Sequence, residues 1–265
     1  MIDADDDVGP MTRLTDLSVV KTLLDRDRAW AAYAIGDLSP GYAADCEWYA
    51  PGDGSPAVLL LYRGFAPPIV FASGETMQLA PVFREIDAPT LSLHLRADGI
   101  AALRSTYDSV QTHAMWRMVI EPGSFRSAGI QDVVALDESS LDAVTALYDD
   151  GRPHDEVPTF FRPSMLQQGT FRGIWEGSDL IAVAGTHLFS PELGVCAVGN
   201  VYTRRDCRRR GLGARVTSAV VQYAIDQAIP TIVLNVGQAN PGARRVYERL
   251  GFRCHCEFFE GEATA

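Results

Sequence analysis

The chain has 265 residues, of which 47% are apolar and 22% are charged, and its formal net charge is −11. This length predicts two domains, and the ordinary balance of apolar and charged residues predicts a packed core in each of them. The acidic start of the chain and the lack of a long uncharged apolar run argue against a secretory signal and a membrane span, and the acidic balance argues against a broad nucleic-acid surface. We therefore expect a cytoplasmic protein, a monomer or a homodimer, that binds neither a membrane nor nucleic acid.

Five cysteines are scattered along the chain, an odd number in a sequence too long to depend on disulfide bonds, so we expect reduced thiols. The one cluster is Cys254-His255-Cys256. It lies in a strand-like stretch, where alternation turns His255 away from the two thiols and leaves two ligands where zinc requires four. We expect no metal cofactor.

The first half of the sequence alternates helical and strand patterns. Apolar residues at helical spacing predict helices within residues 13–35, and a strand pattern occupies residues 114–121. Between them, runs separated by glycine and proline predict strands at 46–50, 57–64, 68–74 and 90–96, with helices at 75–86 and 98–109. This order predicts an α/β half.

A polar stretch rich in glycine, proline and serine, residues 122–129, predicts a boundary near residue 126 and hence domains at 1–126 and 127–265. The second half begins with a predicted strand at 130–136 and a helix at 137–150. After a loop at 151–168 we predict strands at 170–176, 180–189 and 195–203, a helix up to 228, a strand at 231–236, a helix at 241–250 and a strand at 252–259. Strand runs followed by crossover helices predict an α/β fold whose sheet is mixed, of the α+β type.

The stretch CRRRGLGARV, residues 207–216, places arginines and two glycines directly before a predicted helix. A helix N-terminus presents unpaired backbone N–H groups and the positive end of the helix dipole, and glycines let a bulky anion approach. A pyrophosphate would fit there, and arginines could pair with further phosphate oxygens. The candidates for that pairing are Arg204, Arg205, Arg208, Arg209, Arg210 and Arg215. The alternative for this stretch is a solvated loop.

Two better-known phosphate motifs do not match the same stretch. A Rossmann turn requires a third glycine and an acidic residue about 20 residues further on, and both are missing. A Walker loop requires Gly-Lys-Ser/Thr, which does not occur here.

Two blocks of the sequence together resemble the signature of the GNAT superfamily of acetyl-CoA-dependent N-acetyltransferases. RRRGLG, residues 208–213, matches its Gln/Arg-x-x-Gly-x-Gly/Ala loop. NPGARRVYERLGF matches its second block through Asn240, Ala243, Tyr247, Gly251 and Phe252. The resemblance covers residues 128–260 and is greatest to the glycine N-acyltransferase-like branch, in which a degenerate GNAT-like half precedes the working domain. Residues 1–126 are compatible with such a half.

The resemblance implies acetyl-CoA as the co-substrate. It implies that backbone N–H groups of the glycine-rich turn bind the CoA pyrophosphate, that the end of the preceding strand pairs with the pantetheine arm, and that Tyr247 reaches the sulfur. The implied CoA-binding residues are Val201, Thr203, Arg208, Arg209, Arg210, Gly211, Leu212, Gly213, Ala214, Asn240 and Tyr247.

Acyl transfer from a thioester to an amine requires a free amine, a stabilised oxyanion and a leaving thiolate. A phenol can donate a hydrogen bond or a proton to that thiolate, so Tyr247 is the first candidate catalytic residue; the alternative is a packed aromatic side chain. His187, expected on a strand, is the second candidate, as a general base; the alternative is a structural histidine. Glu192 and a water held by Asn200 compete with it for this role.

The loop residues His154, Asp155 and Glu156 are expected where an acceptor enters. No cysteine lies in a nucleophile setting with a base nearby in the sequence, which favours direct transfer in a ternary complex. We therefore predict an N-acetyltransferase that moves an acetyl group from acetyl-CoA to the primary amine of a small-molecule or amino-acid-like acceptor. The alternative is an acyl-CoA-binding regulatory or scaffold module without turnover.

Overall fold

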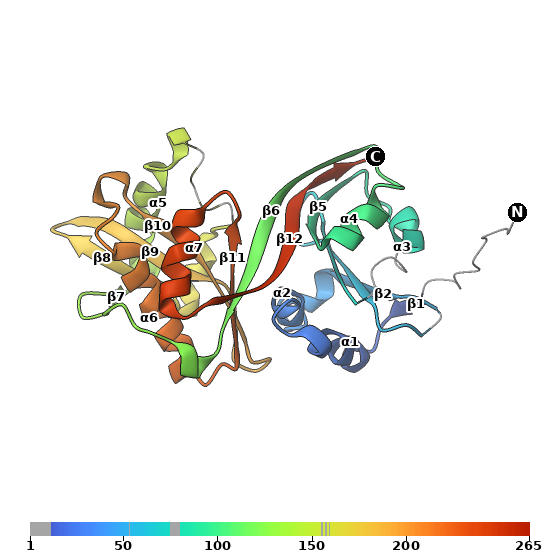
Figure 1. The fold of residues 1–265 in the computed structure, drawn as a ribbon, viewed down its shortest axis with the longest axis horizontal. Coiled ribbons are helices and arrows are strands. Elements are labelled where there is room, and N and C mark those ends of the chain that lie inside the picture. The colour runs from blue at the N-terminus through green and yellow to red at the C-terminus, as the bar shows by residue number, and fades with distance from the viewer. Residues whose placement is uncertain (1–11, 53, 75–79, 155, 157, 159) are drawn as a thin grey trace, which may run out of the picture. The chain divides into compact units, whose positions relative to one another are not determined.

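The computed structural model describes residues 12–52, 54–74, 80–154, 156, 158 and 160–265. Helices alternate with strands, and the strands pair both in parallel and antiparallel (Figure 1). The predicted α/β fold with a mixed sheet is therefore confirmed.

The chain divides into two compact units. The first unit holds the residues up to Trp116 together with Cys256–Ala265, and the second unit holds Arg117–His255. The divisions fall within strands β6 (Ser109–Ile120) and β12 (Arg253–Thr264), whereas the predicted boundary lay in the loop that follows β6. The assignment of functional domains to 1–126 and 127–265 stays a prediction.

The first unit is built on a sheet in which β1 to β4 are antiparallel, β5 is parallel to β4, and the end of β12 is antiparallel to β5. Alternation explains β5, where every second residue is a buried leucine that packs in the core of this unit. The elements are β1 (Thr12–Leu14), α1 (Leu17–Leu24), α2 (Ala32–Gly36), β2 (Cys46–Ala50), β3 (Val58–Tyr62), β4 (Ile69–Ser73), α3 (Ala80–Glu85), β5 (Thr90–Leu95) and α4 (Ala97–Leu103).

The second unit repeats this topology. Strands β7 to β10 are antiparallel, β11 is parallel to β10, and the end of β6 follows β11 in the sheet order. The elements are β7 (Val134–Ala135), α5 (Leu141–Asp149), β8 (Arg172–Glu176), β9 (Asp179–Ser190), β10 (Val195–Thr203), α6 (Leu212–Asp226), β11 (Thr231–Gly237) and α7 (Pro241–Leu250). Each unit thus takes its last strand from the other half of the sequence.

Most predicted elements occur, with differences that have local causes. Residues 13–35 contain α1 and α2 but begin with a strand, β1. The strand predicted at 130–136 is wrong except at Val134 and Ala135, because residues 130–133 form a turn in which the N–H of Val133 donates to the carbonyl of Ile130 at 3.1 Å. Part of the helix predicted at 75–86 lies outside the described residues, and the rest is α3.

Packing on β9 and β10 holds the middle of the second unit. An apolar cluster joins α5, the 163–168 turn and these two strands through Val144, Leu147, Leu166, Phe171 and Val183. Helix α6 packs along β8, β9 and β10 and also contacts α7. The segments that carry the predicted site residues are therefore anchored on one sheet.

Candidate functional site

Strands β9 and β10 are paired irregularly beside the predicted site. On β9, His187 is an extra residue without a Cα partner on β10. On β10, Asn200 and Val201 together face the single residue Ala184. Such β-bulges bend a strand and redirect its side chains, and they are frequent next to active sites.

Strands β10 and β11 separate next to these bulges. They pair in parallel only over residues 195–198 of β10, although β10 continues to Thr203 and β11 to Gly237, all within the described chain. One edge of β10 is therefore unpaired as it approaches the glycine-rich turn. An extended chain such as a pantetheine arm could add to that edge through backbone hydrogen bonds. Val201 and Thr203, predicted for this purpose, both lie in this part of β10.

The loop of residues 204–211, which we call the arginine loop, delivers the chain to the N-terminus of α6. Gly211 is the N-cap residue with φ of 79°, and no side chain caps the helix. A Cβ atom added to Gly211 would have no heavy atom within 4 Å, and one added to Gly213 would meet only Thr203 Oγ1 at 3.3 Å. The uncapped helix start is thus open to an anion, and it includes Leu212 and Ala214.

Most of the arginines near this turn pair with acidic side chains of the same unit. Glu156 accepts from both Arg205, at 2.8 Å, and Arg208. The other pairs are Arg204 with Asp206 and Asp179, Arg210 with Glu176, and Arg215 with Asp132. Arg209, with φ of 65°, forms no ion pair with any residue in the described part of the chain.

Glu156 contacts two arginines of the loop at once. The hydrogen bond from Arg208 lowers the pKa of the Glu156 carboxyl to about 2, so this carboxylate is charged throughout the physiological pH range. Glu156 was predicted to attract an acceptor amine, but in this structure its charge is directed at the arginine loop. Of its predicted companions, His154 is exposed and Asp155 lies outside the described residues.

His187 lies directly against the backbone of β10. A Cβ atom placed on Gly199 would be 2.4 Å from the imidazole Nε2, so only glycine fits opposite this ring. The ring of Phe160 meets the imidazole edge-on, with 5.9 Å between the ring centroids. The structure thus places His187 next to the stretch where β10 leaves β11.

The two competitors for the role of base lie in different places. Asn200 is 3% exposed and follows Gly199 directly. Glu192 lies in the turn between β9 and β10, at the opposite end of β10 from the arginine loop. Since a strand rises about 3.3 Å per residue, the nine residues of β10 separate Glu192 from that loop by roughly 30 Å. Glu192 is therefore a poor candidate.

The second block of the resemblance forms α7 and its caps. The Oδ1 atom of Asn240 accepts from the N–H of Ala243 at 3.0 Å and caps the helix, which leaves its amide Nδ2 as the donor for the predicted bond to pantetheine. Tyr247 is 8% exposed, and burial raises the pKa of its phenol to about 12. Its ring also packs against Phe252, with 6.1 Å between centroids.

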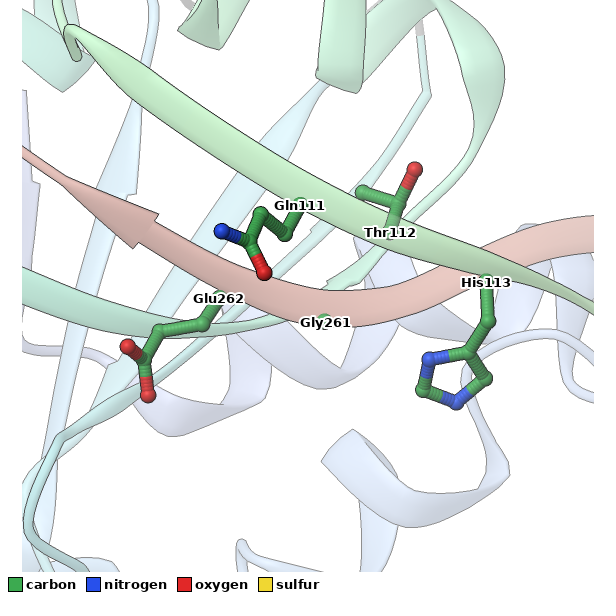
Figure 2. Close-up of a pocket in the computed structure, with 5 residues that line it drawn as sticks. All are labelled: Gln111, Thr112, His113, Gly261 and Glu262. Carbon is green, nitrogen blue, oxygen red and sulfur yellow. The ribbon is translucent and has the colours of Figure 1, made fainter.

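A separate hollow of about 440 Å³ occurs in the first unit. Figure 2 shows its lining residues, Gln111, Thr112 and His113 from β6 and Gly261 and Glu262 from β12. None of the predicted CoA-binding or catalytic residues lines it. The hollow is therefore not the predicted acyl-CoA site.

The comparison with protein families bears directly on these features. A model of the Acetyltransferase (GNAT) family matches residues 138–252. These residues form a GNAT acetyltransferase domain. The GNAT domain lies within the second unit and contains β9, β10, the arginine loop, α6 and α7. Membership implies acyl transfer from acyl-CoA.

Solved structures share the fold over most of the chain. A Drosophila protein aligns with 96% of this chain and 98% of its own, at a TM-score of 0.70 and 12% identity. A GNAT-family acetyltransferase from Colwellia psychrerythraea aligns with 97% of this chain and 100% of its own, at a TM-score of 0.59 and 11% identity. A GCN5-related N-acetyltransferase from Kribbella flavida aligns with 88% of this chain and 95% of its own, at a TM-score of 0.58 and 18% identity. These identities show a shared fold alone, and a search of curated proteins found no match.

Further observations concern cofactors and membranes. No group of His, Cys, Asp or Glu side chains among the described residues could hold a metal ion. The five cysteines, all within the part of the chain that the structure describes, form no disulfide bond. No helix in the described ranges is long and apolar enough to cross a membrane.

Three features beside the GNAT motifs were not identified from the sequence. They are the carboxylate of Glu156 on the arginine loop, the ring of Phe160 on His187, and the paired bulges. Of these, only the bulge on β10 could have been found in the sequence. A glycine inside an apolar strand pattern, such as Gly199, indicates a β-bulge or another group packed closely against the strand. The other two depend on contacts between residues far apart in the sequence.

Proposed function

We propose that the protein is an N-acetyltransferase that moves an acetyl group from acetyl-CoA to the primary amine of a small-molecule or amino-acid-like acceptor. One observation carries the proposal: the unpaired edge of β10 leads through a glycine-rich turn into the uncapped N-terminus of α6, within a GNAT domain. This arrangement supports binding of an extended arm that ends in a pyrophosphate.

The chain's own groups fit that ligand. Backbone N–H groups from Arg208 to Ala214 would bind the pyrophosphate, because Gly211 and Gly213 leave the space in front of the helix open. Arg209, with no acidic partner among the described residues, would meet a phosphate without breaking an ion pair. For Arg208 and Arg210, a phosphate would compete with Glu156 and Glu176.

In the proposed reaction, the amine nitrogen attacks the thioester carbonyl carbon, the new C–N bond forms and the C–S bond breaks. His187 accepts the proton that the amine loses, as its place beside the bulges suits. A backbone N–H at the unpaired edge of β10 would stabilise the developing oxyanion. Tyr247 would donate a hydrogen bond to the departing thiolate.

We propose that transfer is direct, in a ternary complex, without a metal, and that the enzyme is a cytoplasmic monomer or homodimer that binds neither nucleic acid nor a membrane. A cytoplasmic location would keep the five cysteines reduced. The glycine N-acyltransferase-like branch is also a proposal, supported by the two units with equivalent strand topology.

The decisive test is calorimetric titration of Gly211 variants with CoA. Gly211→Glu is expected to abolish binding, because it puts a carboxylate where the pyrophosphate would lie. Gly211→Asn is the matched control, since asparagine tolerates the positive φ without adding charge, and it should bind more tightly than the glutamate variant. Wild-type affinity in a folded Gly211→Glu variant would refute the site.

The acceptor requires a separate screen. Thiol release from acetyl-CoA would be followed with amino acids, polyamines, aminoglycosides and peptide N-termini. Turnover with one class identifies the acceptor. Tight CoA binding without thiol release from any amine would instead favour the non-catalytic acyl-CoA-binding module.

A further inference from the structure

Asn200 is part of the bulge on β10, and its side chain contacts the residue before the bulge on β9. Its backbone has φ of 54°, in the left-handed region that asparagine adopts more readily than other non-glycine residues. It lies on β10 at the point where the strand leaves β11, and it is 3% exposed. A single buried residue therefore shapes the bulge next to the proposed reaction centre.

Hydrogen bonds from Asn200 tie three elements together. Its amide Nδ2 donates to the backbone carbonyl of Thr186 on β9 at 3.3 Å. Its own backbone carbonyl accepts from the hydroxyl of Tyr148, on α5, at 2.9 Å. The direction of the amide follows from chemistry, because the Thr186 carbonyl requires a donor and would repel Oδ1.

The stability of the fold alone does not explain why position 200 carries an asparagine side chain. Asn200 Oδ1 is buried and has no hydrogen-bond donor among the described residues. A buried acceptor without a donor costs free energy, and a glycine would adopt the same left-handed conformation without that cost. The amide Nδ2 donates to the Thr186 carbonyl and also lies 3.6 Å from Met165 Sδ, a weak acceptor, so the bond to Thr186 is the stronger contact for which an asparagine is needed.

That donor acts on the bulge that carries His187. Thr186 immediately precedes His187, and the imidazole lies against Gly199, which immediately precedes Asn200. The Asn200 side chain thus spans the two strands beside the imidazole and sets how closely they approach. Without the Asn200 side chain, the bulge that contains His187 would lose a hydrogen bond between the two strands.

We propose that Asn200 is a positioning residue that holds the imidazole of His187 against β10 through the Nδ2 bond to the Thr186 carbonyl. The proposal rests on the proposed function in one respect, that His187 is the base. Asn200 itself does not transfer a proton. A displaced base would lower turnover much more than acyl-CoA affinity, because the pyrophosphate is expected to be bound by the arginine loop and α6 rather than by Asn200.

Two variants separate the backbone from the side chain of Asn200. Asn200→Gly keeps the left-handed conformation and removes the amide, and Asn200→Asp keeps the shape but replaces the donor with an acceptor that faces the Thr186 carbonyl. Tyr148→Phe is the control, because it removes only the bond to the backbone of Asn200. Calorimetry with CoA should show a change in affinity smaller than the change in kcat for the two Asn200 variants, and no change for Tyr148→Phe.

Turnover is measured with acetyl-CoA and the amine that releases thiol fastest in the acceptor screen. Asn200→Gly is expected to lower kcat about 10- to 100-fold, the scale of a displaced catalytic group. In the His187→Gln background the same change should have no further effect, because a residue that acts through His187 has nothing left to position. An effect of equal size in both backgrounds would overturn the proposal.

A second readout does not depend on turnover. The Cε1–H resonance of His187, assigned by its loss in His187→Gln, should shift in both Asn200 variants and stay in place in Tyr148→Phe. An unchanged resonance in the Asn200 variants refutes the positioning role. Full kcat in His187→Gln would instead remove the base from the proposed function, while the resonance would still decide whether Asn200 positions the imidazole.

Discussion

Tyr247 illustrates how burial changes what a side chain can do. Its phenol has a pKa of about 12, whereas a thiol has a pKa of ~8.5, so complete proton transfer from Tyr247 to a thiolate is unfavourable. The neutral phenol is nevertheless a hydrogen-bond donor throughout the physiological pH range. We therefore expect Tyr247 to stabilise the leaving thiolate by a hydrogen bond.

Tyr247→Phe is expected to lower kcat about 10- to 100-fold, the rate equivalent of one hydrogen bond to a charged group, with little change in CoA affinity. Wild-type kcat should not fall between pH 8 and about 10 through ionisation of this phenol, because its pKa is raised to about 12. Steady-state kinetics over that range and calorimetry check both statements. Undiminished turnover in the variant would make Tyr247 a packing residue.

Within a single element, α7 shows that Gly251 of the second GNAT block has a structural role, as the residue that ends the helix. The helix begins at the Asn240 cap and ends at Gly251, which has φ of 103°. A Cβ atom on Gly251 would lie 2.1 Å from the backbone oxygen of Ser124. Gly251 thus ends the helix in a left-handed residue and lets the chain pass close to the segment after β6.

Gly251→Ala is expected to destabilise the second unit by about 1–2 kcal/mol from the backbone conformation alone, with the contact to Ser124 adding to that cost. Gly242→Ala, in the first turn of the same helix, is the control. Its Cβ would meet only Asn240 Oδ1 at 3.6 Å, so it should be neutral or slightly stabilising. Urea unfolding followed by circular dichroism measures both, and equal stability of the two variants would contradict this account of the cap.

At the scale of the whole chain, the order of strands differs from the order of the sequence. The last ten residues belong to the first unit, where β12 pairs with β5 from Phe259 opposite Leu95 to Thr264 opposite Thr90. Phe258 is fully buried there, stacked on His94 with 4.5 Å between ring centroids and close to Trp30. The core of the first unit is therefore completed by the C-terminus.

Phe258→Ala is expected to destabilise the first unit by about 3–5 kcal/mol, the usual cost of removing a buried phenylalanine side chain. Hydrogen exchange should accelerate at the amides of β3, β4 and β5. Glu262→Ala, an exposed position on the same strand, is the control and should change exchange little. Unchanged exchange in the first unit of the Phe258 variant would show that the C-terminal strand does not stabilise it.

Local signals were sufficient for most elements and for the candidate cofactor loop. Alternating and helical apolar patterns predicted β2, β10, β11 and α7 closely, because those elements are defined by residues near one another in the sequence. The glycine-rich turn was predicted for the same reason. The short strand β7 was overestimated, since an apolar run cannot by itself distinguish a strand from a turn.

Local sequence patterns were sufficient to predict the mixed α/β class, a glycine-rich helix start suited to an anion, and the resemblance to GNAT acyltransferases. All of these depend on short-range spacing of glycines, apolar residues and helix caps. Three features became apparent from the three-dimensional contacts instead: the last strand that each unit takes from the other half of the sequence, the hydrogen bond from Arg208 to Glu156, and the position of the His187 ring against Gly199. These features arise from pairings between distant residues, for which neither composition nor periodicity carries a signal.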